Sequence, residues 1–191
     1  MIHNNSSERN QLRRVLRARR RALSMGERRR AARRFARNLA TALPARRFRE
    51  VALYRASDGE LDPLPALDHE RFRRTRQYLP VLDRVQRGRM RFYPWRRSQP
   101  LRANRFGIGE PRDKPRARAA WALDAILIPL VGFDDRSHRL GMGGGYYDRA
   151  LADLERRPRR PRLIGVAYEF QRLPRLAEAA WDKPVDQVIT D

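Results

Sequence analysis

The sequence contains no cysteine. This absence excludes disulfide bonds, zinc sites built from thiolates and a cysteine nucleophile. Histidine is scarce as well, and its three copies, His3, His69 and His138, are too scattered to suggest a metal cage. No G-x-S-x-G motif marks a serine nucleophile. Covalent catalysis by one of these side chains therefore has no support in the sequence.

Long hydrophobic runs are also missing. The first ten residues, MIHNNSSERN, lack the apolar segment of a signal peptide, and no later run approaches the length of a membrane span. From these features we expect a cytoplasmic protein with no membrane partner.

Lysine is almost absent, although 44 of the 191 residues are basic. Only Lys114 and Lys183 are lysines, so the formal net charge of +22 comes almost entirely from arginine. Residues 1–49 alone carry 16 arginines against two acids. Such a field attracts nucleic acid, anionic membranes and phosphorylated metabolites, and it does not choose among them.

The N-terminal arginines lie on two predicted helices. From about residue 8, the spacing of Leu12, Val15, Leu16 and Leu23 predicts an amphipathic helix with arginine on its other faces. Ser24, followed three residues later by Glu, is a capping box, so a second helix is expected from there to about residue 43. Together they form a basic helical hairpin.

The rest of the chain alternates strand and helix signals, and its length suits a single domain spanning 1–191. Asp62 before Pro63 predicts one helix start, and another helix is expected within 144–155. Residues 97–120 are interpreted as a long functional loop. This alternation predicts an α/β fold with a mostly parallel sheet covered on both faces. The predicted strands are 50–56, 76–82, 90–95, 124–131, 162–168 and a short one near 186–190, and prolines in the second and third indicate edge strands or early ends.

The stretch RLGMGGGYYDRAL, residues 139–151, is the clearest candidate site. It is not a Walker A loop, because Tyr146 follows Gly145 where lysine is required, and it lacks the third glycine of a dinucleotide fingerprint. A glycine run between a buried strand and a helix start still lets the backbone turn tightly and approach an anion. From the residues alone, a tightly turned loop that binds no ligand is the alternative interpretation of this stretch.

Asp148 narrows the possibilities for this stretch. An aspartate in the first turn of a helix is favourable by itself. Beside a polyphosphate it would be repelled, unless magnesium bridged the carboxylate and the phosphate oxygens. Asp148 therefore fits either a loop without phosphate or a metal-bound phosphate.

The segment LDAILIPLVGFDDRSHRLGMGGGYYDRAL closely resembles the signature of 5-formyltetrahydrofolate cyclo-ligases, also called methenyltetrahydrofolate synthetases. The resemblance continues, in order, through LRRVLRARRRALS, SDGELDP, YLPVL, NRFGIGEP and WDKPVDQVITD, so it covers nearly the whole chain. It implies a single three-layer Rossmann-like domain, related to the folds of sugar-phosphate isomerases and CoA transferases and preceded by the basic hairpin. It also implies conversion of 5-formyltetrahydrofolate and ATP, with Mg²⁺, into 5,10-methenyltetrahydrofolate, ADP and phosphate. In that reaction the γ-phosphoryl group activates the formyl oxygen, N10 attacks, and phosphate leaves.

The resemblance also implies site residues. The catalytic residues are Glu60, Tyr147 and Asp148, and the magnesium ligands are Asp148 and Asp186. The folate contacts are Tyr54, Arg55, Glu60, Phe106, Gly145 and Tyr146. The ATP contacts are Arg9, Arg13, Arg139, Leu140, Gly141, Met142, Gly143, Gly144, Gly145, Tyr146 and Tyr147.

The chain departs from some relatives at several of these positions. Arg9 stands where some have lysine, Phe106 where some have tryptophan, and Met142 and Gly144 where some have basic residues. Phosphate contacts within the loop would then come from backbone N–H groups. A family member that binds folate or nucleotide without turnover is therefore one alternative function.

Individual candidate residues also have ordinary structural interpretations. Without the resemblance, Glu60 is interpreted as a solvated carboxylate in a turn. Arg9 and Arg13 are interpreted as solvated charges on a helix face, and Asp186 as an acidic residue in a loop.

A nucleic-acid-binding protein using the arginine hairpin is the other alternative function. Aromatic residues are absent from 1–34 and no groove-reading motif is present. Nucleic-acid binding is therefore expected only as incidental electrostatic attraction. The same charge would suit a folate substrate with a polyanionic polyglutamate tail.

Overall fold

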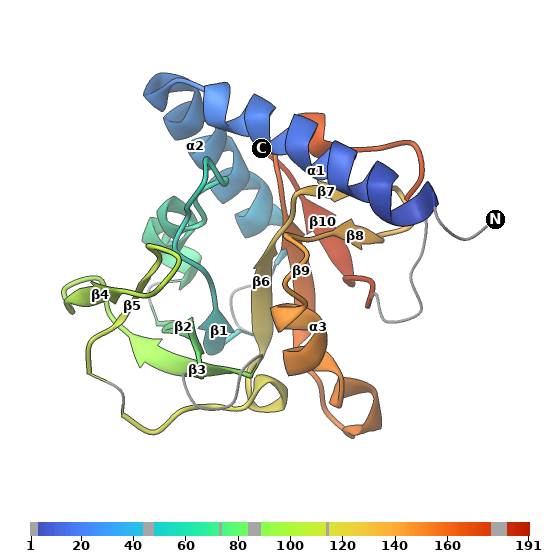
Figure 1. Ribbon diagram of the computed structural model, residues 1–191. Coiled ribbons are helices and arrows are strands. Elements are labelled where there is room, and N and C mark those ends of the chain that lie inside the picture. The colour runs from blue at the N-terminus through green and yellow to red at the C-terminus, as the bar shows by residue number, and fades with distance from the viewer. Residues whose placement is uncertain (1–3, 44–47, 73, 84–88, 114, 177–182) are drawn as a thin grey trace.

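A computed structural model describes residues 4–43, 48–72, 74–83, 89–113, 115–176 and 183–191. They form a six-stranded sheet in the order β10-β9-β6-β1-β2-β3 (Figure 1). All neighbouring strands are parallel except β2 and β3, which are antiparallel. This confirms the predicted α/β fold with a mostly parallel sheet. The strands are β1 (Glu50–Ala52), β2 (Arg76–Leu82), β3 (Met90–Trp95), β6 (Ala125–Pro129), β9 (Arg162–Val166) and β10 (Gln187–Ile189).

The two N-terminal helices are α1 (Asn4–Ala22) and α2 (Met25–Ala42). The predicted capping box starts α2: the Ser24 side chain accepts the Glu27 N–H, and the Glu27 carboxylate accepts the Ser24 N–H at 2.8 Å. The predicted apolar stripe of α1 is wrong at Val15, which is 57% exposed. Leu16 is buried, and four residues later Arg20 is buried too, so the buried line of α1 continues through an arginine.

Both faces of the sheet are buried, which gives three layers. One face packs against α2 and the 3-10 helix η2 (Leu64–Asp68), with Phe35 and Leu127 among its core residues. The other face packs against α3 (Tyr146–Leu151), with Phe92 and Leu151 in its core. In a third, smaller cluster, Leu16 of α1 packs with Val131, just after the carboxyl end of β6.

Several predicted elements differ in detail. β2 is not an edge strand, because it lies between β1 and β3. Its Pro80 is tolerated because the last β1–β2 pair is Ala52 with Tyr78, so no β1 residue lies opposite the missing N–H. Asp62 accepts the Leu64 N–H at 3.0 Å, but Pro63 is the N-cap residue, one position later than predicted, and only a 3-10 helix follows.

The predicted loop 97–120 contains a small hairpin of β4 (Leu101–Ala103) and β5 (Gly109–Pro111). A second pair, β7 (Gly132–Phe133) and β8 (Arg139–Leu140), follows β6 and leads into the glycine stretch. In Figure 1, α1 crosses the top of the molecule above these segments, and it contacts β7. Among the described residues, no helix combines the length and the apolarity needed to cross a membrane.

Candidate active site

The candidate site lies where three segments meet at the carboxyl ends of the parallel strands, and Arg20 joins them. Its guanidinium, 1% exposed, donates to the backbone oxygen of Asp58 at 2.8 Å and to the Asp58 carboxylate at 2.7 Å. It also donates to the backbone oxygen of Leu130 at 3.4 Å and approaches Glu60 Oε1 at 3.7 Å. One buried cation of α1 therefore fixes the turn after β1 against the end of β6.

The turn after β1 fits closely against α1. Asp58 and Gly59 both have positive φ, at 49° and 76°. A Cβ atom at Gly59 would lie 2.8 Å from the backbone oxygen of Arg20, so a larger residue would displace α1 as well as strain the turn. Glu60 Oε2 accepts the backbone N–H of Ser57 at 3.0 Å, which holds the carboxylate inside the turn.

Glu60 lies in an unusual electrostatic setting. Burial raises its pKa by more than Arg20 and the Ser57 donors lower it. The Tyr54 hydroxyl donates to the backbone oxygen of Leu61 at 2.5 Å. Burial first, and then the charge of Glu60, raises the pKa of both Tyr54 and Tyr147. The structure thus brings Glu60, Tyr54 and Tyr147 into one neighbourhood, where both phenols stay protonated.

The glycine stretch forms an open turn beside α1. Gly143 and Gly145 have φ values of 90° and 62°, which favour glycine. Arg13 donates through Nε to the backbone oxygen of Gly141 at 2.8 Å, and its guanidinium lies 3.7 Å from where a Gly143 Cβ would be. The predicted ATP contacts of α1 and of the glycine stretch are therefore adjacent. Arg9 lies four residues before Arg13 on the same helix and is half-buried.

The helix predicted within 144–155 is short, because α3 has only six residues. On its first turn, Asp148 accepts a hydrogen bond from Arg139, which is 5% exposed and also donates to the backbone oxygen of Lys183. Leu140 is fully buried against Leu16, so only its backbone could reach a ligand.

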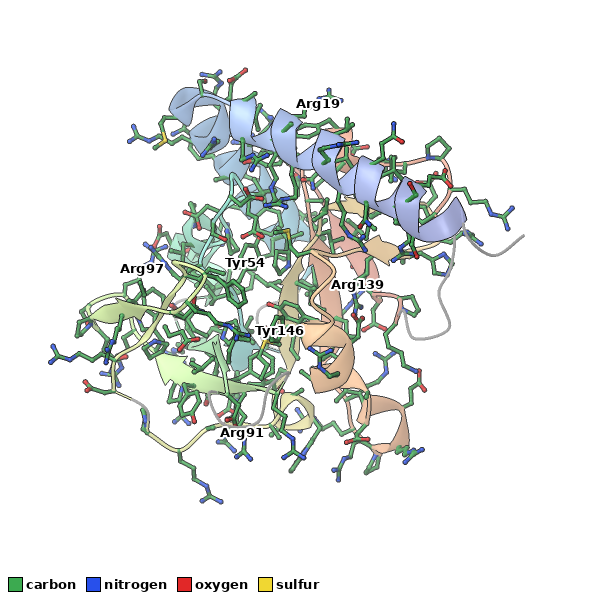
Figure 2. The ribbon with its side chains drawn as sticks, viewed as in Figure 1. Arg19, Tyr54, Arg91, Arg97, Arg139 and Tyr146 are labelled. Atoms are coloured by element: carbon green, nitrogen blue, oxygen red, sulfur yellow. The ribbon has the colours of Figure 1, made fainter. Side chains whose placement is uncertain are left out.

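Aromatic side chains border the glycine stretch on the side of the β4–β5 hairpin. Phe106, 55% exposed at the tip of the hairpin, meets the Tyr146 ring edge-on, with centroids 6.2 Å apart. Arg105 donates to the Tyr146 hydroxyl at 2.6 Å. Arg55, by contrast, turns its guanidinium toward the Trp95 ring at 5.7 Å. In Figure 2, the labelled Tyr54, Tyr146 and Arg139 lie in the centre of the view below α1.

The two predicted magnesium ligands have different surroundings. Both oxygens of Asp186 accept from Arg160, at 2.7 and 2.9 Å, and one also accepts the Leu163 N–H at 2.7 Å. Burial would raise the Asp186 pKa, but these donors outweigh it and lower the pKa. Here Asp186 ties the start of β10 to β9. Within the described ranges, no three His, Asp or Glu side chains gather as a metal site.

The model of the 5-formyltetrahydrofolate cyclo-ligase family matches residues 5–191. The chain belongs to this family. The cyclo-ligase of Escherichia coli K12 is 34% identical over 177 residues, which cover 92% of this chain and 96% of that protein. The cyclo-ligase of Haemophilus influenzae is 32% identical over 145 residues, or 75% of this chain and 76% of that protein.

Solved structures agree with this family. The 5,10-methenyltetrahydrofolate synthetase of Aquifex aeolicus superposes with a TM-score of 0.78 at 34% identity, covering 95% of this chain and 88% of that one. The synthetase of Mycoplasma pneumoniae gives 0.73 at 28% identity, covering 96% and 98%. The resemblance, the fold class and the ligase class predicted from the sequence are confirmed.

The sequence did not point to several residues of this candidate site. Arg20 was indistinguishable from the exposed arginines around it, although its i+4 spacing from Leu16 placed it on the buried line. Asp58, its partner, was not assigned. Arg105 was not assigned, because it reaches the glycine stretch through a tertiary contact, and Arg149 was not assigned, because only the folded turn brings its side chain back to Gly144.

A separate groove of about 1360 Å³ lies at the amino ends of the parallel strands. Trp121, 47% exposed, is part of its wall. None of the predicted site residues lines it. Its seven arginines are Arg74, Arg76, Arg91, Arg96, Arg97, Arg116 and Arg118, and we refer to it as the arginine groove.

Proposed function

We propose that the chain converts 5-formyltetrahydrofolate and ATP into 5,10-methenyltetrahydrofolate, ADP and phosphate. Family membership supports the substrate and the product. The structural observation that carries the proposal is the meeting of Glu60, Tyr147 and the glycine stretch under α1. One domain spanning 1–191 performs the reaction, in the cytoplasm.

The folate side of the site is formed by Glu60 and the aromatic wall. Glu60, whose side chain is 10% exposed and held by Ser57, is set to hydrogen-bond the polar ring or formyl region of the folate. Phe106 presents an exposed ring on which a flat pterin can stack, and Tyr146 lies against it. Burial of a carboxyl beside two protonated phenols lets these groups hold or share a proton near the reacting atoms.

The ATP side is formed by the glycine stretch and Arg13. No atom lies within 4 Å of a Cβ placed on Gly141, so the backbone there is open to a ligand. Bound ATP supplies the phosphoryl group that turns the formyl oxygen into a leaving group. The chain's own part is to position and to stabilise charge, and phosphoryl transfer depends mainly on those two contributions.

Magnesium fits the site in one of two expected positions. Such ions are usually held by one or two carboxylates together with phosphate oxygens, so magnesium does not require the cluster of three ligands that is missing from the described residues. Asp148, 26% exposed beside the glycine stretch, is suited to share such an ion with ATP, where the ion would neutralise phosphate charge. Arg139 bonds only one oxygen of Asp148, whereas Arg160 bonds both oxygens of Asp186 and would first have to be released.

The direct test is the appearance of methenyltetrahydrofolate absorbance when the protein is mixed with 5-formyltetrahydrofolate, ATP and magnesium. Product should form with the complete mixture and not when ATP or magnesium is omitted. A folded protein that forms no product refutes the enzyme proposal. If calorimetry then detects binding of ATP and folate, the chain is a family member that binds without turnover.

The arginine groove supports a second candidate, a polyanion such as nucleic acid. Glu50 pairs with Arg118 at 3.2 Å and Arg76 at 3.5 Å, which leaves the groove strongly cationic. Binding to single-stranded nucleic acid in a gel shift that persists at physiological salt favours this function. Binding lost steeply as salt rises marks incidental attraction. A lower KM for polyglutamylated than for monoglutamylated folate would assign the basic surface to the substrate.

A further inference from the structure

We infer that Arg149 binds the polyphosphate of ATP, together with Arg13, from the other side of the glycine stretch. The inference rests on the proposed function and deepens it. Neither the glycine motif nor the family resemblance gave Arg149 a role. The argument comes from where its side chain lies.

Arg149 folds back over the glycine stretch. Its Nη2 donates to the backbone oxygen of Gly144 at 2.7 Å, and its guanidinium lies 5.3 Å from the centre of the Tyr146 ring. A Cβ atom on Gly145 would lie 2.7 Å from Nη1. An exposed arginine on a helix can extend into solvent without losing side-chain entropy. The Arg149 side chain is instead ordered by these contacts, which hold its positive charge over the loop.

Arg13 and Arg149 flank the loop from separate elements. Arg13 of α1 donates to the backbone oxygen of Gly141, and Arg149 of α3 donates to that of Gly144. The loop between them, 141–145, has no cationic side chain of its own. Two guanidinium groups therefore supply the positive charge that the loop sequence lacks.

Other sources of positive charge at the loop are weaker. A helix of six residues has little macrodipole to offer an anion. Arg139 is nearly buried and already engaged by Asp148 and Lys183. Arg149 is thus the exposed cation of α3 nearest the loop.

The guanidinium geometry suits phosphate. It carries five N–H donors in a plane, so one group can hold a loop carbonyl and a phosphate oxygen together. Paired guanidinium groups recognise phosphates with shorter and stronger hydrogen bonds than neutral donors. The expected ligand is the phosphate chain and not the base. Removing Arg149 should therefore weaken the binding of ATP and ADP far more than the binding of AMP.

The test compares Arg149→Ala, Arg149→Lys and the control Arg156→Ala. Arg156 is an exposed arginine of the next 3-10 helix, η5 (Leu154–Arg156), and its loss changes the net charge equally. In Arg149→Ala the KM for ATP should rise about tenfold or more, while the KM for folate stays within about twofold. Lysine should restore part of the loss, and the control should match wild type.

Two results would overturn the inference. One is an unchanged KM for ATP in Arg149→Ala. The other is an equal rise in both KM values with a lower Tm, which marks Arg149 as a support of the loop. If wild type forms no product, the proposed function fails, and calorimetry with ATP, ADP and AMP then decides the inference alone. A weaker affinity of Arg149→Ala for ATP and ADP but not AMP upholds it, whereas equal affinities reject it.

Discussion

The two basic regions of the molecule differ in how their arginines are held. At the carboxyl ends of the strands, Arg20 and Arg139 are almost fully buried, and each is bonded to a carboxylate and to at least one backbone oxygen. In the arginine groove, Arg91, Arg96 and Arg116 are exposed. The number of arginines therefore does not distinguish the two regions, whereas their burial and their partners do.

The energetic reason is the surroundings of each charge. Exposed ion pairs contribute little, because water and salt screen them. A buried charge must be bonded, and removing one partner leaves the other uncompensated. Substitutions at the carboxyl ends should therefore have large effects on activity and stability, and matched substitutions in the groove should have small ones.

The largest effect is expected for Arg20→Met. The substitution leaves Glu60 without its buried cation, whereas Asp58 keeps the more exposed Arg17 and Arg21, so stability should fall by about 3 kcal/mol, the lower end of the range for a broken buried ion pair. The turn that carries Glu60 should loosen, and kcat/KM should fall by about 100-fold or more. Thermal unfolding and steady-state kinetics measure both effects.

Arg21→Ala is the matched control for Arg20. Arg21 is 52% exposed and reaches Asp58 only at 3.3 Å. Its loss should change Tm and kcat/KM little. Equal effects of the two substitutions would mean that burial does not distinguish these arginines.

Asp148→Asn should come next in size. The amide keeps the shape of the side chain but removes the charge that magnesium and Arg139 require, so turnover should fall about 100-fold or more while the fold stays intact. The measurement is kcat over a range of magnesium concentrations, with circular dichroism as the check on folding. Near-normal rates would remove Asp148 from the metal site.

Glu60→Gln should alter the pH dependence of stability. Burial raises the folded-state pKa of Glu60 above its ordinary 4.5, so the folded state retains a proton that the unfolded state has lost. Wild-type stability should therefore lose the contribution of Glu60 as pH rises from about 4.5 through the raised pKa. The Tm of Glu60→Gln minus the Tm of wild type should therefore increase as pH rises through this range. A difference in Tm that stays constant with pH would contradict a raised pKa for Glu60.

The smallest effect is expected in the arginine groove. Arg96→Ala and Arg116→Ala should leave kcat/KM within about twofold and stability within about 0.5 kcal/mol of wild type. The measurement uses monoglutamylated folate, so that a polyanionic tail does not contribute. A large loss of activity would place the groove in the reaction.

Local sequence signals predicted much of the fold and the position of the site. Ser24 and its capping box fixed the start of α2, and the glycine run marked a turn between a strand and a helix. Tertiary contacts decided the rest. Val15 is exposed and Arg20 is buried, the reverse of what the pattern predicts, because tertiary packing determines which side of α1 is covered. Pro80 lies in an interior strand because the pairing of β1 with β2 ends before it. Arg149 has no signal in the sequence, since only the folded loop shows what it covers.

Hydrogen–deuterium exchange with both ligands would compare the two regions in a single measurement. Adding ATP, magnesium and 5-formyltetrahydrofolate should slow exchange in the segments 54–60 and 139–149 and leave exchange in 91–97 and 115–122 unchanged. Amides that already exchange slowly without ligand are left out of the comparison, because they cannot report further protection. Protection confined to the segments of the arginine groove, with none at the glycine stretch, would contradict the assignment of the active site to the carboxyl ends of the strands.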